Sequence, residues 1–490
     1  VTYEHVVSNI PHENIVEKAL EVRGCKIKIT KIPIPVSYGP AFEGERVRKP
    51  DMHVEFGGNI TKCFEFVTST EMDAINDGEI TVVGKDIDAV SPGTALPLAI
   101  WVEVAGRKMQ QDFEPILERQ IHRFTNGAEG VQHISQRDIV WLRISKSDFA
   151  KGFRLRHLGE ILHAKYLSEY PSIVGKVKVT LFTEAAEVEK RLEIARKVYI
   201  ERNNRVASMT DESVDVFYSC LLCQSFAPNH VCVITPERTG LCGAYNWLDG
   251  KAAYEIDETG ANQPVKKQDC IDPNKGLWEG VNKYVYTNSH KAIENFCLYS
   301  IMDRPMTSCG CFEVICAYVP ECNGIMAVNR EFPGDTPVGM TFSTLAGNVG
   351  GGAQTPGFMG IGKTYLVSRK FISAEGGFKR LVWMPKELKQ LLETDFKRRS
   401  TEEGIPDLLD KIADETIATD PQKIRQFLEQ VGHPALSMPD MSIVAETPAY
   451  TTPASEQASS SGMVSATRQP AKSTSPIGQS NAILPVSLTQ

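Results

Sequence analysis

Residues 220–247 read Cys220-Leu-Leu-Cys223-Gln-Ser-Phe-Ala-Pro-Asn-His-Val-Cys232-Val-Ile-Thr-Pro-Glu-Arg-Thr-Gly-Leu-Cys242-Gly-Ala-Tyr-Asn-Trp247. Four cysteines in this run follow the spacing C-x2-C-x8-C-x9-C, which can close on one tetrahedral thiolate site. C-x2-C pairs occur both in structural zinc sites and in iron–sulfur proteins. Zinc knuckles usually present two such pairs, whereas here the second pair is spread to x9. The spacing alone leaves zinc and a [4Fe-4S] cluster open.

A second motif, Cys309-Gly310-Cys311, follows later in the chain. Two thiolates one residue apart chelate a single ion only if the backbone amides between them also bind. Deprotonated amides of Gly310 and Cys311 would complete a planar N2S2 set, which suits Ni(II). Gly310 has no Cβ, so the backbone can flatten there. An isolated C-x-C is a weak signal, and two thiols in a turn are the alternative. Together the two motifs predict a mixed nickel–iron–sulfur centre.

The two motifs resemble those of the CO-methylating acetyl-CoA synthases. Residues 220–247 are similar to that family's cluster segment, and Cys309-Gly310-Cys311 falls where the family keeps a dinickel site. The resemblance covers roughly residues 20–440. The large extra N-terminal domain of bacterial members is not visible in this sequence. The resemblance therefore predicts the shorter archaeal type, the beta subunit of an acetyl-CoA decarbonylase/synthase complex.

The resemblance implies a Ni-Ni-[4Fe-4S] centre and a role for each ligand. The cluster ligands would be Cys220, Cys223, Cys232 and Cys242, and the Cys223 sulfur would also reach the proximal nickel. Cys309 and Cys311 would bridge that nickel to a distal one, which the amides of Gly310 and Cys311 also bind. Phe226 and Thr307 would wall the small pocket beside the reactive nickel. The catalytic residues are thus predicted as Cys223, Cys309, Cys311, Phe226 and Thr307.

The implied activity is that of an acyltransferase. It would assemble or cleave acetyl-CoA from carbon monoxide, a methyl group carried by a corrinoid protein, and coenzyme A. The implied partners are carbon monoxide dehydrogenase subunits, a corrinoid iron–sulfur protein, coenzyme A or acetyl-CoA, and ferredoxin. Two other interpretations stay open: an electron-transfer subunit whose cluster only relays electrons, and a zinc-stabilised scaffold. Nickel content separates the first from the synthase, and colour excludes the second, because zinc thiolates are colourless.

Composition sets outer limits on these functions. The chain has 490 residues, 42% hydrophobic and 23% charged, so two or three soluble domains are expected. A net charge of -8 argues against nucleic-acid binding. No apolar run is long enough to span a bilayer, and no secretory signal is visible. The protein is therefore expected in the reducing cytoplasm, where cysteines bind metals rather than form disulfides. The other cysteines are predicted to be small core residues: Cys25, Cys63, Cys270, Cys297, Cys316 and Cys322.

The predicted fold class is mixed α/β (α+β) in several domains. Residues 1–205 are expected to form an α/β domain that could bind coenzyme A or a partner. Residues 206–445 are expected to form the metal-cluster domain, with a short helical C-terminal part. The Ser/Thr/Pro-rich residues 446–490 are predicted to be a disordered tail. Strands are predicted at 97–104, 176–182 and 312–319, and helices after a Thr183 cap and over 419–431.

Three further features have more than one interpretation. Gly357–Thr364 matches the P-loop pattern G-x4-G-K-[ST], but no strand is predicted before it and a strand is predicted over 365–371, so nucleotide hydrolysis is rejected. The glycine-rich 347–352 is expected to allow close backbone approach to the metal centre. His230 is predicted to hydrogen-bond a cluster sulfur rather than to ligate. A basic group, Arg154, Arg156, His157 and Lys165, fits either coenzyme A phosphates or a solvated surface.

Overall fold

The computed structural model describes residues 32–58, 60–137, 140–225 and 227–441. It shows a mixed α/β fold with several sheets, as the sequence predicted. The predicted tail, 446–490, lies outside the described residues. The domain boundaries near 205 and 445 stay predictions. Separate hydrophobic cores form before residue 200 and after residue 216.

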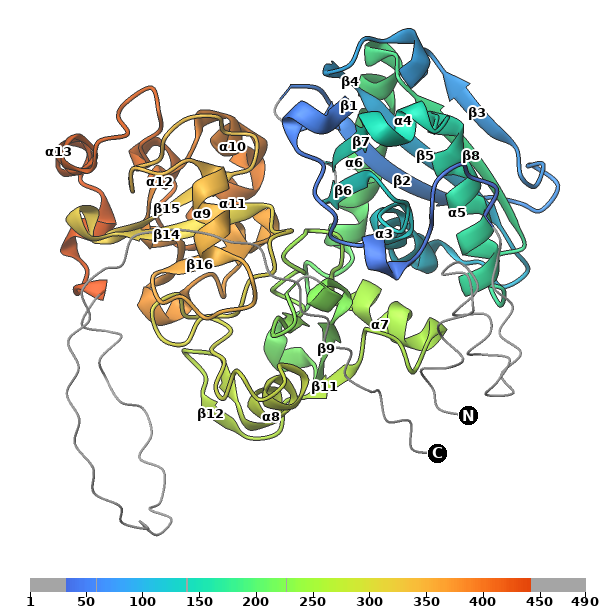
Figure 1. The fold of residues 1–490 in the computed structure, drawn as a ribbon. Helices are drawn as coiled ribbons and strands as arrows, with labels where there is room; N and C mark the ends of the chain where they lie inside the picture. Colours follow the sequence, from blue (N-terminus) through green and yellow to red (C-terminus); the bar gives the residue numbers. More distant parts are fainter. Residues whose placement is uncertain (1–31, 59, 138–139, 226, 442–490) are drawn as a thin grey trace, which may run out of the picture. The chain divides into compact units, whose positions relative to one another are not determined.

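One four-stranded sheet near the N-terminus has the order β2-β5-β8-β3 (Figure 1). Its strands are β2 (Cys63–Ser69), β5 (Leu98–Ala105), β8 (Lys176–Phe182) and β3 (Ile80–Val83). The strands predicted at 97–104 and 176–182 are therefore confirmed. Alternate residues serve two cores: Ile100 and Val102 pack with helix α5 (Leu155–Glu169), while Phe64 and Phe66 pack with helix α6 (Ala185–Asn204). The sheet is consequently covered on both faces.

Helix α6 follows the predicted pattern with two corrections. The three- and four-residue spacing of Ala185, Val188, Leu192, Ala195 and Tyr199 predicts one apolar face, and all of these residues except the exposed Ala185 are buried. The predicted Thr183 cap is wrong, because the N-cap residue is Glu184. The Thr183 hydroxyl instead donates to the Lys85 carbonyl at 2.9 Å, which ties the end of β8 to the loop after β3.

The second N-terminal sheet has the order β4-β1-β7-β6. Its strands are β4 (Thr94–Leu96), β1 (Met52–Gly57), β7 (Val140–Ser145) and β6 (Val131–Ser135). The short helix α4 (Lys146–Ala150) follows β7. Helix α3 (Glu114–Thr125) contacts β2, β6 and α5. Most of its side chains are buried although many are charged or polar, so α3 lies inside the fold rather than on its surface.

The middle of the chain has short elements joined by long loops. A three-stranded sheet has the order β10-β9-β11, with β9 (Val216–Cys220), β10 (Cys232–Ile234) and β11 (Pro264–Lys266). A two-stranded pair joins β12 (Cys270–Asp272) to β13 (Leu277–Trp278). Two helices accompany them, α7 (Trp247–Ile256) and α8 (Glu279–Asn288). These elements position the cysteine-rich segment.

The C-terminal sheet has the order β16-β14-β15-β17. Its strands are β16 (Phe358–Ile361), β14 (Val314–Val319), β15 (Gly324–Asn329) and β17 (Leu381–Trp383). The helices are α9 (Phe342–Val349), α10 (Lys386–Leu391), α11 (Glu393–Glu402), α12 (Leu408–Lys411) and α13 (Pro421–Val431). The strand predicted at 312–319 is confirmed within two residues. Helix α13 is also confirmed, with Asp420 as its cap and Pro421 at its first turn.

The P-loop-like motif has no nucleotide-binding geometry. Strand β16 occupies the middle of the motif, where a phosphate-binding loop would have to be, and pairs with β14. The Lys363 ammonium lies 3.2 Å from the buried Glu313 carboxylate. The strand predicted over 365–371 is wrong: Lys363–Val367 is a 3-10 helix, because the Tyr365 hydroxyl donates to the Lys370 carbonyl and folds the segment back.

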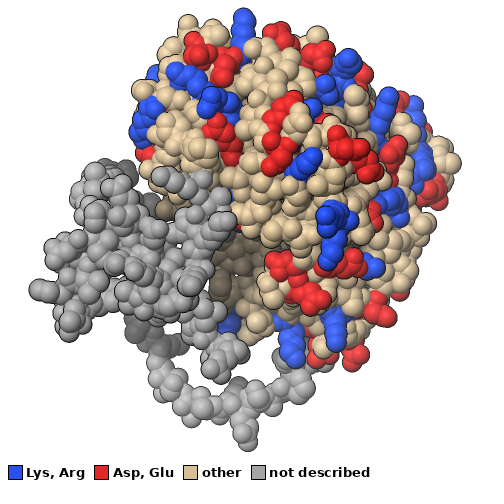
Figure 2. Space-filling view, turned by 90° about the vertical axis from the view of Figure 1, so that its right-hand side faces the viewer, with Lys and Arg blue, Asp and Glu red and all other residues tan. Residues whose placement is uncertain are grey.

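The surface offers little to nucleic acid in the view of Figure 2, where Lys and Arg side chains are interspersed with Asp and Glu. Within the described ranges, no helix combines the length and apolar character needed to cross a membrane.

Candidate metal centre

The four-cysteine segment is arranged by β9, β10 and the loops beside them. Cys220 ends β9 and lies directly opposite Cys232, the first residue of β10. Cys223 lies between them in a 3-10 turn, Leu222–Ser225, and Cys242 follows in the loop after β10. Burial raises the pKa of Cys220 to about 11 and that of Cys232 to about 12. These thiols therefore stay protonated at neutral pH unless a cation takes the proton's place.

The Cys309-Gly310-Cys311 turn immediately precedes β14. Gly310 has φ +134°, a region that favours glycine. Two backbone hydrogen bonds join the turn to the glycine-rich segment. The Gly351 amide donates to the Cys309 carbonyl at 3.2 Å, and the Gly352 amide donates to the Ser308 carbonyl at 2.9 Å. A Cβ on Gly352 would lie 2.9 Å from the His230 backbone nitrogen. The glycine-rich backbone thus packs closely against the cysteine turn and His230, while its approach to the metal centre or to substrate stays a prediction.

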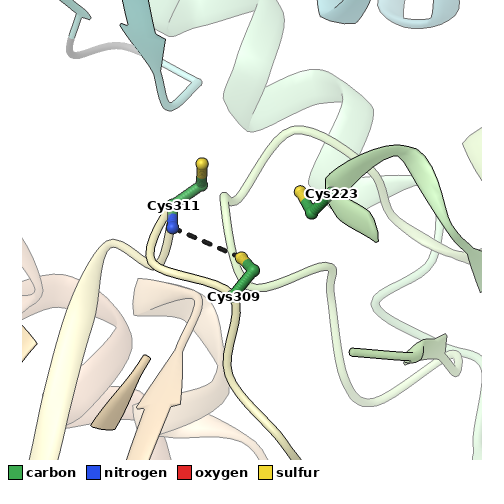
Figure 3. Close-up of side chains that lie close together, drawn as sticks. All are labelled: Cys223, Cys309 and Cys311. Carbon is green, nitrogen blue, oxygen red and sulfur yellow. Dashed lines mark hydrogen bonds between the residues drawn. The ribbon is translucent and has the colours of Figure 1, made fainter. Parts of the chain in front are cut away.

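The fold joins the two cysteine motifs. The sulfurs of Cys223, Cys309 and Cys311 all lie within 4.8 Å of one another, and all three residues are buried (Figure 3). The Cys311 amide donates to the Cys309 sulfur at 3.3 Å, so the amide nitrogen faces the same place as the thiols. All cysteines that the structure describes are free thiols. Three buried thiols that converge without a disulfide form a donor set suited to a soft metal ion.

The pKa values of the three thiols are shifted in different directions. Hydrogen bonds from Cys223 and Cys309 lower the pKa of Cys311 well below its usual range. Hydrogen bonding to Cys309 and Cys311, with burial, raises the pKa of Cys223 well above normal. One thiolate therefore forms readily, whereas further ionisation requires a positive charge nearby.

Helix α3 supplies such a charge. The Arg119 guanidinium is buried, with Nη2 3.9 Å from the Cys223 sulfur and Nη1 donating to the Ser135 carbonyl at 3.2 Å. Burial disfavours its charge, but the charges of Cys242 and Cys223 outweigh this effect and raise the pKa of Arg119. Burial and the charge of Arg119 together hold the pKa of His122 well below normal. Arg119 is therefore a permanent cation against the thiols, held in place by the first half of the chain.

Two further contacts join the loop after β6 to the cysteine segment. The Gln136 side-chain amide donates to the Phe312 carbonyl at 2.5 Å, and the Arg137 backbone amide donates to the Cys242 carbonyl at 3.1 Å. Sequence reasoning missed Arg119, Gln136 and Arg137. Each lies roughly 100 residues or more along the chain from the residue that it contacts, and the sequence has no local pattern linking them.

The predicted pocket residues have different outcomes. Thr307 is fully buried, and its hydroxyl lies 3.0 Å from Nδ1 of His230. Phe226 lies outside the described residues. Nδ1 of His230 contacts Thr307, and the predicted hydrogen bond from His230 to a cluster sulfur stays a prediction. Burial lowers the pKa of His230 to about 4, so the ring is neutral and can fix the Thr307 hydroxyl.

The basic group on α5 is already engaged inside the first half of the chain. Arg154 donates to the Phe149 and Phe153 carbonyls, Arg156 pairs with Glu160 at 3.0 Å, and Lys165 pairs with Glu169. The His157 ring is buried and accepts the Arg154 backbone amide at 2.8 Å. These contacts favour a structural role over phosphate binding for this group.

The remaining cysteines mostly behave as predicted. Cys63, Cys297, Cys316 and Cys322 are buried. Cys270 is exposed, so its predicted place in the core is wrong; it lies in the short two-stranded pair β12–β13, which has little to bury it. Cys25 lies outside the described residues.

Two family models match the chain, one in each half. Residues 34–188 match the family described as "CO dehydrogenase/acetyl-CoA synthase complex beta subunit", and residues 199–442 match the C-terminal family of the "ACS/CODH beta subunit". The carbon monoxide dehydrogenase/acetyl-CoA synthase subunit alpha of Moorella thermoacetica is 58% identical over 428 residues, which are 87% of this chain and 59% of that protein.

Two archaeal proteins are also similar. The acetyl-CoA decarbonylase/synthase complex subunit beta 1 of Methanocaldococcus jannaschii is 44% identical, over 89% of this chain and 56% of that protein. The corresponding subunit beta of Methanopyrus kandleri is 45% identical, over 82% of this chain and 85% of that protein. This chain thus spans less than two thirds of the first two relatives and most of the third.

Proposed function

This chain belongs to the family of the CO dehydrogenase/acetyl-CoA synthase complex beta subunit, and on that premise we propose that it is an acetyl-CoA synthase. The proposed reaction joins carbon monoxide, a methyl group from a corrinoid protein, and the thiol of coenzyme A, or cleaves acetyl-CoA in reverse. The family prediction from the two cysteine motifs is confirmed by the match to both halves of the chain.

One observation supports this function above the others. Cys223 belongs to the four-cysteine run, yet its sulfur lies within 4.8 Å of those of Cys309 and Cys311. A cluster that only relays electrons needs four thiolates and has no use for two more beside one of them. The shared position of Cys223 fits a centre in which an iron–sulfur cluster and a second metal have one sulfur in common.

The residues present fit a Ni-Ni-[4Fe-4S] group. Cys220, Cys223, Cys232 and Cys242 would hold the cluster, and Cys223, Cys309 and Cys311 would hold the proximal nickel. The distal nickel would take the Cys309 and Cys311 sulfurs with the Gly310 and Cys311 amides. The nickel, when bound, supplies the site at which the carbon groups combine and pass to coenzyme A.

The protein's own contribution is ligation, charge and exclusion of water. All three sulfurs of the convergent set are buried, so water is kept from the soft metal. Arg119 offsets the negative charge of the thiolates. The Thr307 hydroxyl, fixed by neutral His230, places a small polar group beside the Cys309 turn. In the proposed complex, carbon monoxide dehydrogenase subunits, a corrinoid iron–sulfur protein and ferredoxin are the partners.

The test is acetyl exchange between acetyl-CoA and free coenzyme A by reduced, nickel-loaded protein. This exchange needs only the nickel site and coenzyme A, so it can be measured without partner subunits. Cys309→Ala should abolish the exchange, whereas the matched control Cys270→Ala, which removes an exposed thiol, should leave it unchanged. Nickel-loaded protein without any exchange, or an exchange that survives Cys309→Ala, would contradict the proposal.

A further inference from the structure

A second arginine, the half-buried Arg330, contacts the Cys309-Gly310-Cys311 turn. It follows β15, whose last residue, Asn329, pairs with Val314 at the start of β14. Because β14 and β15 are antiparallel, the residue after Asn329 lies beside the segment that precedes Val314. Glu313 and Phe312 separate Val314 from the Cys309-Gly310-Cys311 turn, so the hairpin register places Arg330 near the turn and its long side chain reaches Gly310.

The guanidinium of Arg330 contacts the turn through one atom. Nη2 donates to the Gly310 carbonyl oxygen at 2.8 Å. The guanidinium carbon lies 4.9 Å from the ring centre of Phe342, the first residue of α9, so the ring holds the group in place. Nε is buried and has no hydrogen-bond partner in the described part of the chain. A charged group is thus held against an aromatic ring and directed at one carbonyl oxygen.

The Gly310 carbonyl and the Cys311 nitrogen belong to the same peptide bond. In a trans peptide the N–H and C=O point in opposite directions. Accordingly, the nitrogen faces the Cys309 sulfur at 3.3 Å, while the oxygen faces Arg330 at 2.8 Å. An amide that binds a metal through its deprotonated nitrogen is an anion, and resonance places part of its charge on the oxygen. A guanidinium at that oxygen stabilises the anion directly.

We propose that Arg330 is a positioning residue for the N2S2 nickel site, which holds the Gly310–Cys311 peptide in register and stabilises its negative charge when nickel is bound. This inference rests on the proposed function, because it assumes that the Cys311 amide is a ligand. It adds a cation dedicated to the distal metal, whereas Arg119 lies against the cluster cysteines. The balance of the step is simple: the amide proton leaves to solvent, the nitrogen–nickel bond forms, and no electrons are transferred.

Nickel(II) titrated into the full chain, with its iron–sulfur cluster in place, tests the role. The affinity is read by competition with a chelator, and the planar site by its visible ligand-field bands. Arg330→Gln should weaken nickel binding by about 10- to 100-fold, the loss expected for a hydrogen bond to a charged group. Arg330→Lys keeps the charge and should recover part of that loss. The surface control Arg398→Gln, on α11, should bind nickel as the unaltered chain does.

A vibrational measurement separates charge stabilisation from a purely structural role. The nickel-induced infrared band of the amide carbonyl should move to higher frequency in Arg330→Gln, because the carbonyl loses its charged donor. Unchanged affinity and an unchanged band would overturn the inference. Loss of iron together with nickel in Arg330→Gln, or equal nickel affinities in Arg330→Lys and Arg330→Gln, would also overturn it. If the unaltered chain shows no planar nickel site, the proposed function itself fails.

Discussion

Between Met52 and Asn204 the chain forms strands of up to eight residues and a helix of 20, whereas between Val216 and Glu313 its strands have two to five residues. In the first region, apolar side chains on both faces of the β2-β5-β8-β3 sheet are buried. The second has long loops around eight cysteines, six of which are the predicted metal ligands. Its apolar residues are also buried, but most of them lie in loops rather than in paired strands, so few backbone hydrogen bonds between strands hold this region together. Metal–thiolate bonds can add stability here, because metal binding free energy adds to folding free energy.

The largest effect should come from removing the metals. We expect chelation under reducing conditions to lower hydrogen-exchange protection across residues 216–313 by at least about tenfold, while β5 and β8 stay protected. The reason is that Cys220 and Cys232 lie directly opposite each other, so a cluster bound by both would hold β9 and β10 together. Exchange measured by mass spectrometry with peptide resolution checks this. Equal loss of protection in both regions would mean that the metal stabilises the chain as a whole.

A core truncation in the first region should have the converse effect. Leu192 is buried on α6, and Leu192→Ala should lower the free energy of unfolding by about 2–5 kcal/mol. Iron and nickel content should not change. Denaturant unfolding with metal analysis checks both points. The control Ile194→Ala, exposed on the same helix, should stay within about 0.5 kcal/mol of the unaltered chain. Metal loss in Leu192→Ala would show that the two regions are not independent.

Arg119 is one of the contacts between the two regions, and its loss should act on the cluster. Arg119→Gln removes a cation 3.9 Å from the Cys223 sulfur. The reduced, more negative cluster then loses stabilisation, so its reduction potential should fall by on the order of 100 mV, as expected for such a charge at an intermediate dielectric. A redox titration followed by electron paramagnetic resonance checks this. Arg123→Gln, on the same helix but paired with Glu169, is the control. An unchanged reduction potential in Arg119→Gln would show that Arg119 does not stabilise the reduced cluster.

The smallest effect concerns a helix remote from the metals. The Asp420 carboxylate accepts the Lys423 amide and caps α13. Asp420→Ala should cost about 1 kcal/mol of stability and leave the visible spectrum unchanged. Thermal unfolding followed at a helix signal and at a cluster signal checks both. A change in the cluster spectrum would show that α13 and the metal centre are coupled through the C-terminal sheet.

The same two regions differ in what their sequence predicts. In the first, apolar periodicity located β5, β8 and the buried face of α6, because regular elements repeat at fixed spacing. In the second, cysteine spacing located both motifs, while the choice between zinc and an iron–sulfur cluster came from the family resemblance. The family resemblance predicted that the two motifs meet at Cys223, and in the structure the sulfurs of Cys223, Cys309 and Cys311 lie within 4.8 Å of one another.

The positions of the two arginines beside the cysteines were not predictable. Arg119 lies in Glu-Pro-Ile-Leu-Glu-Arg-Gln-Ile-His, which looks like an ordinary surface helix, and only tertiary packing buries its polar side chains. Arg330 looks like a polar residue after a strand, and the hairpin register alone brings it to Gly310. Long-range contacts of single residues leave no repeating pattern in a sequence. The exposed Cys270 was missed for the opposite reason, since residue type alone indicated burial.

Metal analysis of anaerobically purified chain, run beside Cys309→Ala and Cys220→Ala, tests the central claim most directly. The unaltered chain should contain about four iron and about two nickel ions. Cys309→Ala should keep its iron and visible spectrum and lose its nickel, because its sulfur is predicted to hold nickel alone. Cys220→Ala should lose iron. If Cys309→Ala lost the iron while Cys220→Ala kept it, or if an active preparation held iron without nickel, the assignment of the two motifs would be contradicted.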